Sequence, residues 1–259
     1  MKGLAIIFRR EVFNLFISPA TYVVTFYYLI LLGVGFRFFL ESLVSTDWIL
    51  PPLASLIVAM IFGSPAIVPF LTMRSLAEEK RLGTMEILLA APVSATSIVL
   101  GKWAASYFFY AILAFSALSF PILVTFLFPK ETANLQLLEE AQLIGGGTYL
   151  LTAGATFTSI GIFASSITRN QMVAGMLTFT LLALKLGTMT YFYNDYDQSS
   201  SALTTETMIY DLIGSILTGF DKLEHFVIGF IDFQTLLNFT LTTTLFLAFS
   251  IISTERNSI

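Results

Sequence analysis

The sequence predicts an all-α integral membrane protein with six transmembrane helices and an amphipathic helix at its N-terminus. Two observations carry this prediction. Hydrophobic residues fill 56% of the 259 positions and charged residues only 12%, well below the ~25% charged residues of soluble domains. The apolar residues also form stretches long enough to cross a hydrocarbon core ~30 Å thick, which takes about 20 residues of α-helix.

Six segments have this length and use almost the whole chain. Because backbone polar groups in lipid must be paired within their own segment, each is expected to be a helix. No room remains for a separate soluble domain, so residues 1–259 are interpreted as one transmembrane domain. The predicted spans are residues 20–40, 53–73, 103–128, 143–166, 172–193 and 233–253.

Residues 1–18 precede the first span and are predicted to form an amphipathic helix in the membrane interface. On a helical projection one stripe is apolar and the opposite one polar: Leu4, Phe8, Val12 and Leu15 against Arg10, Glu11 and Asn14. Ser18 and Pro19 end this helix, and proline is well tolerated at the first position of the next. The alternative is an extension frayed in solution, which would leave much aromatic surface in water.

The second span contains Pro65 and Pro69. Proline removes a backbone hydrogen bond and clashes with the preceding turn, so this helix is predicted to be bent or locally broken. A break inside the membrane must be covered by protein or line a water-filled cavity. A kink used only for packing and a kink that belongs to a transport path both remain open.

Between the second and third spans, residues 74–102 interrupt the apolar chain with charge, glycine and proline. Ser75 and Glu78 have the spacing of a capping box, which predicts a helix just after Arg74. Gly83 and Thr84 are expected to end it, before a short apolar piece that stops at Pro92. Ser94 can then cap the third span. The alternative is an ordinary amphipathic loop lying on the membrane.

Three further features concern the later spans. Gly147, Gly154 and Gly161 recur every seven residues and predict a close helix contact, within the subunit or between two subunits. Lys185 lies inside the fifth span, where it could line a transport path, reach the outer surface by snorkelling, or pair with an acid of the outer loop. Residues 194–232 form that loop, in which residues 208–220 are apolar but too short to span and predict a re-entrant or interfacial helix.

Basic residues divide unevenly between the two sides and predict cytoplasmic termini. One side holds Lys2, Arg9, Arg10, Arg74, Lys80, Arg81, Lys102, Arg169 and Arg256, and the other Arg37, Lys130 and Lys222. Residues 74–102 and the short connection Thr168, Arg169 and Asn170 then both lie in the cytoplasm.

The sequence lacks the residue patterns of metal sites and of ATP-binding loops, and the chain is predicted not to be an enzyme. There is no cysteine and one histidine, too few ligands for a zinc, haem or iron–sulfur site. Thr96 stands where a phosphate-binding loop needs its first glycine, and Trp103 follows Lys102 where that loop needs Ser or Thr. The chain therefore should not hydrolyse ATP itself, and its basic residues are too scattered to bind nucleic acid.

Residues 74–102 resemble the cytoplasmic segment of ABC-2-type permeases, whose pattern is approximately R-x-L-A-E-E-x-R-x-G-T-x-E-x-L-L-x-x-P-V-S followed by I-V-L-G-K. The stretches FRREVFNLFISPATYVV, SSITRNQMVAG and FDKLEHFVIGFIDFQTLLNF are similar to the branch of gliding-motility and nitrous-oxide-reductase accessory permeases. The resemblance runs from end to end of the chain. Its matching residues in the segment include Arg74, Glu78, Glu79, Arg81, Gly83, Thr84, Glu86, Leu88 and Pro92.

The resemblance implies the permease subunit of an ABC transporter of the type V exporter kind, in the inner (plasma) membrane of a prokaryotic cell. Residues 74–102 would dock on a separate ATP-binding subunit, which would bind ATP and Mg²⁺. A second permease subunit, identical or paralogous, and the surrounding membrane lipid complete the expected partners. Most members of this family export their substrates.

Two other functions stay open. An ATP-independent channel or secondary transporter should carry more ionisable groups within the membrane and a repeat between its halves, and neither is evident. A membrane anchor or assembly component of an ABC-type machine would use the ATPase for mechanical work, as the similarity to gliding-motility permeases suggests.

Overall fold

The computed structural model describes residues 2–44, 52–85, 88, 93–127, 129, 140–196 and 223–256. Regular structure in this part of the chain is helical, and it contains no strand. The elements are α1 (Lys2–Ile17), α2 (Pro19–Val44), α3 (Pro52–Thr72), α4 (Ala77–Leu82), α6 (Ala95–Leu127), α8 (Glu140–Ile167), α9 (Gln171–Tyr196), α11 (Leu223–Ile228) and α12 (Phe233–Arg256).

Five helical segments are long and apolar enough to cross a membrane, in α2, in α3 continued through α4, in α6, in α8 and in α12. This length and composition agree with a multi-pass membrane protein. The predicted span 172–193 also forms a helix, α9, but within the described residues its apolar part, Gln171–Gly187, is shorter than the others. Five crossings therefore meet these criteria among the described residues, and the six counted from the sequence are not confirmed.

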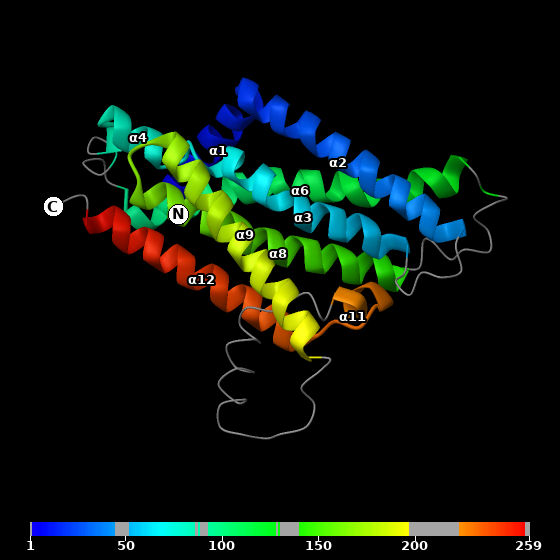
Figure 1. Ribbon diagram of the computed structural model, residues 1–259. Coiled ribbons are helices and arrows are strands. Elements are labelled where there is room, and N and C mark those ends of the chain that lie inside the picture. The colour runs from blue at the N-terminus through cyan, green and yellow to red at the C-terminus, as the bar shows by residue number, and fades with distance from the viewer. Residues whose placement is uncertain are drawn as a thin grey trace, which may run out of the picture.

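Helix α8 lies at the centre of the bundle and packs against α3, α6, α9, α11 and α12 (Figure 1). On the opposite side of α3, α2 forms an outer layer, and α1 lies along the first half of α6. The core between the long helices is rich in fully buried aromatic side chains, among them Tyr28, Tyr110, Tyr149 and Phe157. Large apolar side chains remain exposed along α2, which is expected of a helix surface that contacts lipid.

Both ends of the described chain lie at the same end of the bundle as α4 (Figure 1). Near the N-terminus, Gly3 approaches Val93 just before α6. Near the C-terminus, the hydroxyl of Ser253 donates a hydrogen bond of 3.0 Å to the carbonyl of Ser166 at the end of α8. This end, which we call the α4 end, therefore gathers α1, α4, the start of α6, the end of α8 and the end of α12.

Helix α6 begins eight residues before the predicted span 103–128. The side chain of Ser94 accepts the backbone N–H of Ser97 at 3.3 Å, and the Ser94 carbonyl accepts that of Ile98, so Ser94 starts the helix as expected of a cap. Hydropathy placed the start at residue 103 because the preceding turns include Lys102. Residues 95–102 are therefore the first two turns of α6 and not a separate part of segment 74–102.

Helix α3 runs without interruption through Pro65 and Pro69, so the local break predicted from these prolines is not present. Proline at position 65 cannot donate to the carbonyl of Ile61. The hydroxyl of Ser64 donates to that carbonyl instead, at 2.6 Å. This replacement bond lets the helix continue past the proline.

Residues 197–222 lie outside the described residues, and with them the predicted re-entrant or interfacial helix at 208–220. The residues directly after them were expected to lie on a polar surface. They form α11 instead, which packs against α8 with Leu223 and Phe226 buried. The ring of Phe226 meets that of Tyr149 edge-on at 5.3 Å.

Candidate functional site

Helix α4 is a short charged helix that contacts α8 and α9. Its first turn carries Glu78 and Glu79 and its last turn Lys80 and Arg81, an order that favours both ends of the helix dipole. Gly83 ends it with a left-handed backbone, φ 70°, and donates its N–H to the carbonyl of Glu79. Glycine reaches this conformation without the steric cost that a side chain would bring.

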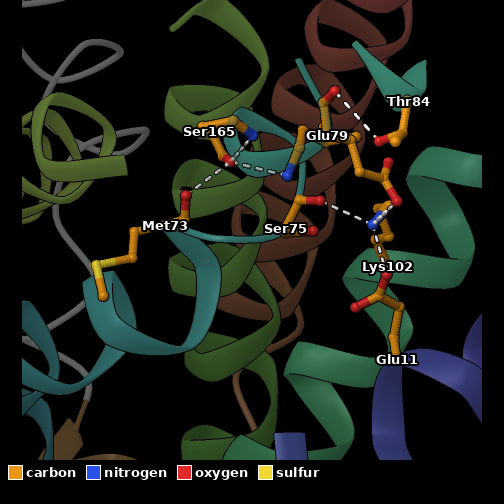
Figure 2. Close-up of polar contacts among 9 residues, drawn as sticks. Glu11, Met73, Ser75, Glu79, Thr84, Lys102 and Ser165 are labelled. Atoms are coloured by element: carbon orange, nitrogen blue, oxygen red, sulfur yellow. Dashed lines mark hydrogen bonds and ion pairs between the residues drawn. The ribbon is translucent and has the colours of Figure 1, made fainter. Parts of the chain in front are cut away.

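The N-terminus of α4 is capped by a residue from another helix. Leu76 is the N-cap residue, and the hydroxyl oxygen of Ser165 on α8 accepts the backbone N–H groups of Leu76 and Ala77, both at 3.0 Å (Figure 2). The Ser165 hydroxyl also donates to the carbonyl of Met73 at 3.4 Å. The capping box predicted from Ser75 and Glu78 is therefore wrong, and α4 instead depends on α8 for its first turn.

Lys102 of α6 holds three elements together at this point (Figure 2). Its ammonium group lies 2.5 Å from a carboxylate oxygen of Glu11 on α1 and 3.0 Å from one of Glu79 on α4. It also donates to the carbonyl of Ser75 at 2.7 Å. Its side chain is only 2% exposed, so these contacts are what make its burial tolerable. We call Lys102, Glu11 and Glu79 the ion cluster.

The helical projection placed Glu11 on the polar stripe of α1, opposite the apolar one, and this prediction is wrong. Glu11 shares the half-buried face with Leu4, Phe8 and Leu15, which is the face that packs on α6. The projection assigned Glu11 to the polar side by residue type alone. A charged residue on a packed face is stable here because a buried cation lies opposite to it.

Lys80 joins α4 to the ends of two further helices. Its ammonium group donates to the carbonyl of Ser166 in the last turn of α8, which also accepts the hydroxyl of Ser253 on α12. Carbonyl groups at a helix C-terminus lack partners within the helix, so a lysine is a favourable partner there. Through Ser165, Lys102 and Lys80, α4 is bound by side-chain contacts to α1, α6 and α8.

Three other described charges of the segment are exposed or half-exposed. Arg74 is exposed and lies 3.4 Å from the hydroxyl of Ser18, where α1 meets α2. Glu78 and Arg81 form a long ion pair of 3.9 Å, with 37% and 55% of their side chains exposed. Exposed pairs of this kind add little stability. Their side chains are instead available to another molecule.

Past Gly83, the segment continues with Thr84, whose hydroxyl lies 3.4 Å from the carbonyl of Glu79. Leu88 packs against the small apolar cluster that Ile98, Val99 and Ile162 form beside the start of α6. Glu86 and Pro92, also predicted as part of this site, lie outside the described residues.

The second predicted connection lies close to α4. Thr168, Arg169 and Asn170 join α8 to α9, and both of these helices contact α4. The side chain of Asn170 accepts the backbone N–H of Met172 at 3.0 Å and so caps α9. Arg169 and Asn170 are exposed. The two segments predicted to share the cytoplasmic face thus share one end of the bundle.

The glycines of α8 make close contacts within this chain. A Cβ atom built on Gly154 would lie 2.1 Å from the ring of Tyr110 on α6, and one on Gly161 would lie 2.3 Å from the hydroxyl of Thr72 on α3. Gly147 is buried. A third close approach occurs at Gly145, where a Cβ would lie 1.9 Å from the carbonyl of Phe226. Glycine lets these neighbours reach the α8 backbone.

Lys185 lies far from α4, within α9. Its side chain is buried, and its ammonium group lies 5.7 Å from the centre of the Phe239 ring on α12. A lysine so placed points into the bundle.

Sequence reasoning missed Lys102, Glu11 and Ser165 as members of this site. Lys102 was counted as a positive charge and as the last residue of segment 74–102, and Ser165 was included within the stretch SSITRNQMVAG. A signal was nevertheless present, because a lysine two turns inside an apolar helix requires a counter-charge. Glu11 and Glu79 are acids near the same predicted membrane boundary.

No group of three or more His, Cys, Asp or Glu side chains that could hold a metal ion occurs among the described residues. In comparison with known proteins, a family model described as an ABC-2 family transporter protein matches residues 6–256. No curated protein matches the sequence significantly.

Proposed function

The chain belongs to the ABC-2 family of transporter proteins, as the match over residues 6–256 shows, and from this membership we propose that α4 couples ATP hydrolysis in a partner subunit to movement of the spanning helices. Family membership makes the chain a membrane subunit of an ABC transporter, a transport component that associates with an ATP-binding subunit.

The attachment of α4 is the observation that carries the proposal. A six-residue helix is too short to be stable by itself. Here Ser165 caps it from α8, Lys102 binds it to α6 and α1, and Lys80 binds it to the end of α8. A force applied to α4 therefore reaches three helices through charge-assisted or capping contacts.

The outward charges supply a surface for the partner. Arg74, Glu78 and Arg81 are exposed or half-exposed on this end. Charged side chains around a docking surface set the orientation and rate of association. In the proposed mechanism, the ATP-binding subunit contacts α4 through these groups, and its closure on ATP displaces α4 together with the first turns of α6.

Charge reversal on α4 tests this proposal. In Glu78→Arg, we expect the permease to keep its fold but to lose co-purification with its ATP-binding subunit and ATP-dependent transport. Glu41→Arg is the matched control, because Glu41 is also an exposed helical glutamate but lies at the far end of α2. The proposal fails if Glu78→Arg still binds the ATP-binding subunit normally, or if Glu41→Arg weakens the association equally.

Several finer assignments belong to the same proposal. The α4 end would be cytoplasmic, with both termini, because Arg9, Arg10, Arg74, Arg81 and Arg169 lie there. Helix α9 would be the sixth crossing, and α1 would lie in the membrane interface. The partner would bind ATP and Mg²⁺.

The resemblances noted in the sequence support the rest of the assignment. They favour export, a location in the inner membrane of a prokaryotic cell, and membership of the branch of gliding-motility and nitrous-oxide-reductase accessory permeases. A second permease subunit, identical or paralogous, would complete the path. Lys185 would line this path only if it faces a cavity between the subunits, which Lys185→Met tests through transport with assembly intact.

A further inference from the structure

A cleft of about 300 Å³ opens beside the ion cluster. It lies where α1, the start of α2, the end of α3, α4 and α6 meet. Its lining is chiefly polar and charged toward α1 and α4 and apolar toward α3, where Phe70 and Leu71 contribute. At ~30 Å³ for each water molecule, it has room for about ten waters or for a small polar group of similar size.

The floor of the cleft carries an excess of negative charge. Two carboxylates, Glu11 and Glu79, share the single ammonium group of Lys102, so the cluster has a formal charge of −1. Both acids are largely buried, with 17% and 12% of their side chains exposed. An unbalanced buried charge is costly, which makes a second cation favourable at this floor.

Two polar atoms at the floor lack partners. Oε2 of Glu79 and Oγ of Ser75 are buried and have no hydrogen-bond partner among the described residues. Ser75 is 8% exposed, and both residues line the cleft. A buried oxygen without a donor costs more than the hydrogen bond would contribute. Both atoms are covered in this structure, so a ligand with several N–H donors would satisfy them once the surrounding side chains shift to admit it.

The rim carries the opposite charge. Arg10 and Arg74 line the cleft and are exposed, while the third charged rim residue, Glu78, lies beside Arg81. Guanidinium groups are well suited to phosphate oxygens. The cleft therefore offers two different subsites, anionic at the floor and cationic at the rim.

The surface around the cleft is apolar. Phe70 is 47% and Leu82 62% exposed, and Phe16 and Ile17 are exposed at the end of α1. Exposed apolar residues on a spanning helix are suited to acyl chains. They are compatible with a ligand that carries apolar chains, such as a membrane lipid.

We propose that this cleft binds the headgroup of a phospholipid that carries a primary ammonium group, with the ammonium on Glu79 and Ser75 and the phosphate on Arg10 and Arg74. The three N–H donors of such a group match the floor, and the phosphate matches the rim. The bound lipid would link α1 to α4 beside the ion cluster. The site shares Arg74 and Glu78 with the surface proposed for the ATP-binding subunit, but lipid binding is measured without that subunit and does not depend on it.

The lipid headgroups themselves provide the first test. The full-length protein is purified in detergent and titrated with phosphatidylethanolamine, phosphatidylcholine or phosphatidylglycerol of identical acyl chains, and bound lipid is counted by native mass spectrometry. Phosphatidylcholine keeps the phosphate and the positive charge but has no N–H donor, and phosphatidylglycerol has no cation. We expect phosphatidylethanolamine to bind at least about tenfold more tightly than either, the equivalent of ~1.4 kcal/mol. Equal binding of the ethanolamine and choline lipids would overturn the proposal without any substitution.

Variants then separate the floor from the rim. Glu79→Gln should remove the preference for the ethanolamine lipid, and Arg10→Gln should weaken all three lipids about equally. Arg9→Gln is the matched control, because Arg9 is an exposed arginine of the same helix that does not line the cleft. If Arg9→Gln weakens binding as much as Arg10→Gln, the lipids bind through nonspecific charge and the assignment is wrong.

Two other occupants are distinguished by separate measurements. Soluble phosphoethanolamine that binds as tightly as the lipid would identify a soluble ligand. Release of bound phosphatidylethanolamine by the ATP-binding subunit, with loss of that subunit's binding in Arg10→Gln, would identify a protein contact. Either result overturns the lipid assignment.

Discussion

Replacing Lys102 with methionine should destabilise the protein by about 3–5 kcal/mol. The substitution keeps the length and apolar stem of the side chain but removes the cation of the ion cluster. The side chains of Glu11 and Glu79 are only 17% and 12% exposed. Without Lys102, these two largely buried carboxylates would have no counter-charge. The carbonyl of Ser75 would also lose a donor.

The reason for this magnitude lies in the charges left behind. Breaking a buried ion pair by removing one partner leaves the other partner buried and uncompensated, whereas replacing all members by neutral groups is often close to neutral. The triple variant Lys102→Met/Glu11→Gln/Glu79→Gln should therefore recover most of the stability that the single variant loses. This recovery distinguishes an electrostatic effect from a loss of packing.

The measurement is the free energy of unfolding of the purified protein in detergent, followed by circular dichroism in increasing denaturant. Arg81→Met is the control, because its ion pair with Glu78 is long and exposed and should be worth no more than about 1 kcal/mol. A Lys102→Met variant as stable as Arg81→Met would refute the reasoning. So would a triple variant no more stable than Lys102→Met.

Three further substitutions test the contacts of α4 and α8. Ser165→Ala should cost about 1 kcal/mol by removing the cap of α4, and hydrogen exchange at the amides of Leu76 and Ala77 should accelerate; unchanged exchange would contradict the cap. Gly154→Ala should cost about 1–3 kcal/mol in thermal unfolding, because its Cβ overlaps the Tyr110 ring. In the control Gly33→Ala, no described atom lies within 4 Å of the new Cβ, and a gain of about 0.5–1 kcal/mol is expected. Gly83→Ala should cost about 1–2 kcal/mol, because φ at this residue is 70°; a neutral effect on melting would show that the turn adapts.

The sequence predicted best those features that depend on neighbouring residues. The junction of α1 and α2 falls at Ser18 and Pro19, α4 ends at Gly83, and Ser94 caps α6, all from chemistry within one or two turns. The helical class and the approximate positions of the long helices followed from hydropathy, because spanning requires a fixed length of apolar helix.

Contacts between distant parts of the chain were not predictable in the same way. Lys102 and Glu11 are 91 positions apart, and the cap of α4 joins Leu76 to Ser165 across 89. A single sequence shows the residue types of such pairs but not which members meet. The capping box was predicted because it was the only local donor–acceptor pattern at the start of α4, and a tertiary contact replaced it.

The start of α6 differs from the start of the apolar stretch that it contains. Hydropathy locates the edge of the apolar stretch, near residue 103, whereas the helix begins where its cap lies, at residue 95. At ~1.5 Å per residue, the 33 residues of α6 extend ~50 Å, about 20 Å more than the hydrocarbon core.

The long helix α6 approaches the backbone of α8 closely near its middle. The ring of Tyr110, which lies against Gly154, is 15 residues from Ala95 and 17 from Leu127, so the two arms measure ~22 Å and ~26 Å. A rigid rod that tilts about such a contact moves its ends in opposite directions by similar distances. In the proposed coupling, a displacement of α4 toward the bundle axis would therefore appear at the other membrane face as an outward displacement of nearly equal size, with the Tyr110–Gly154 contact as its pivot.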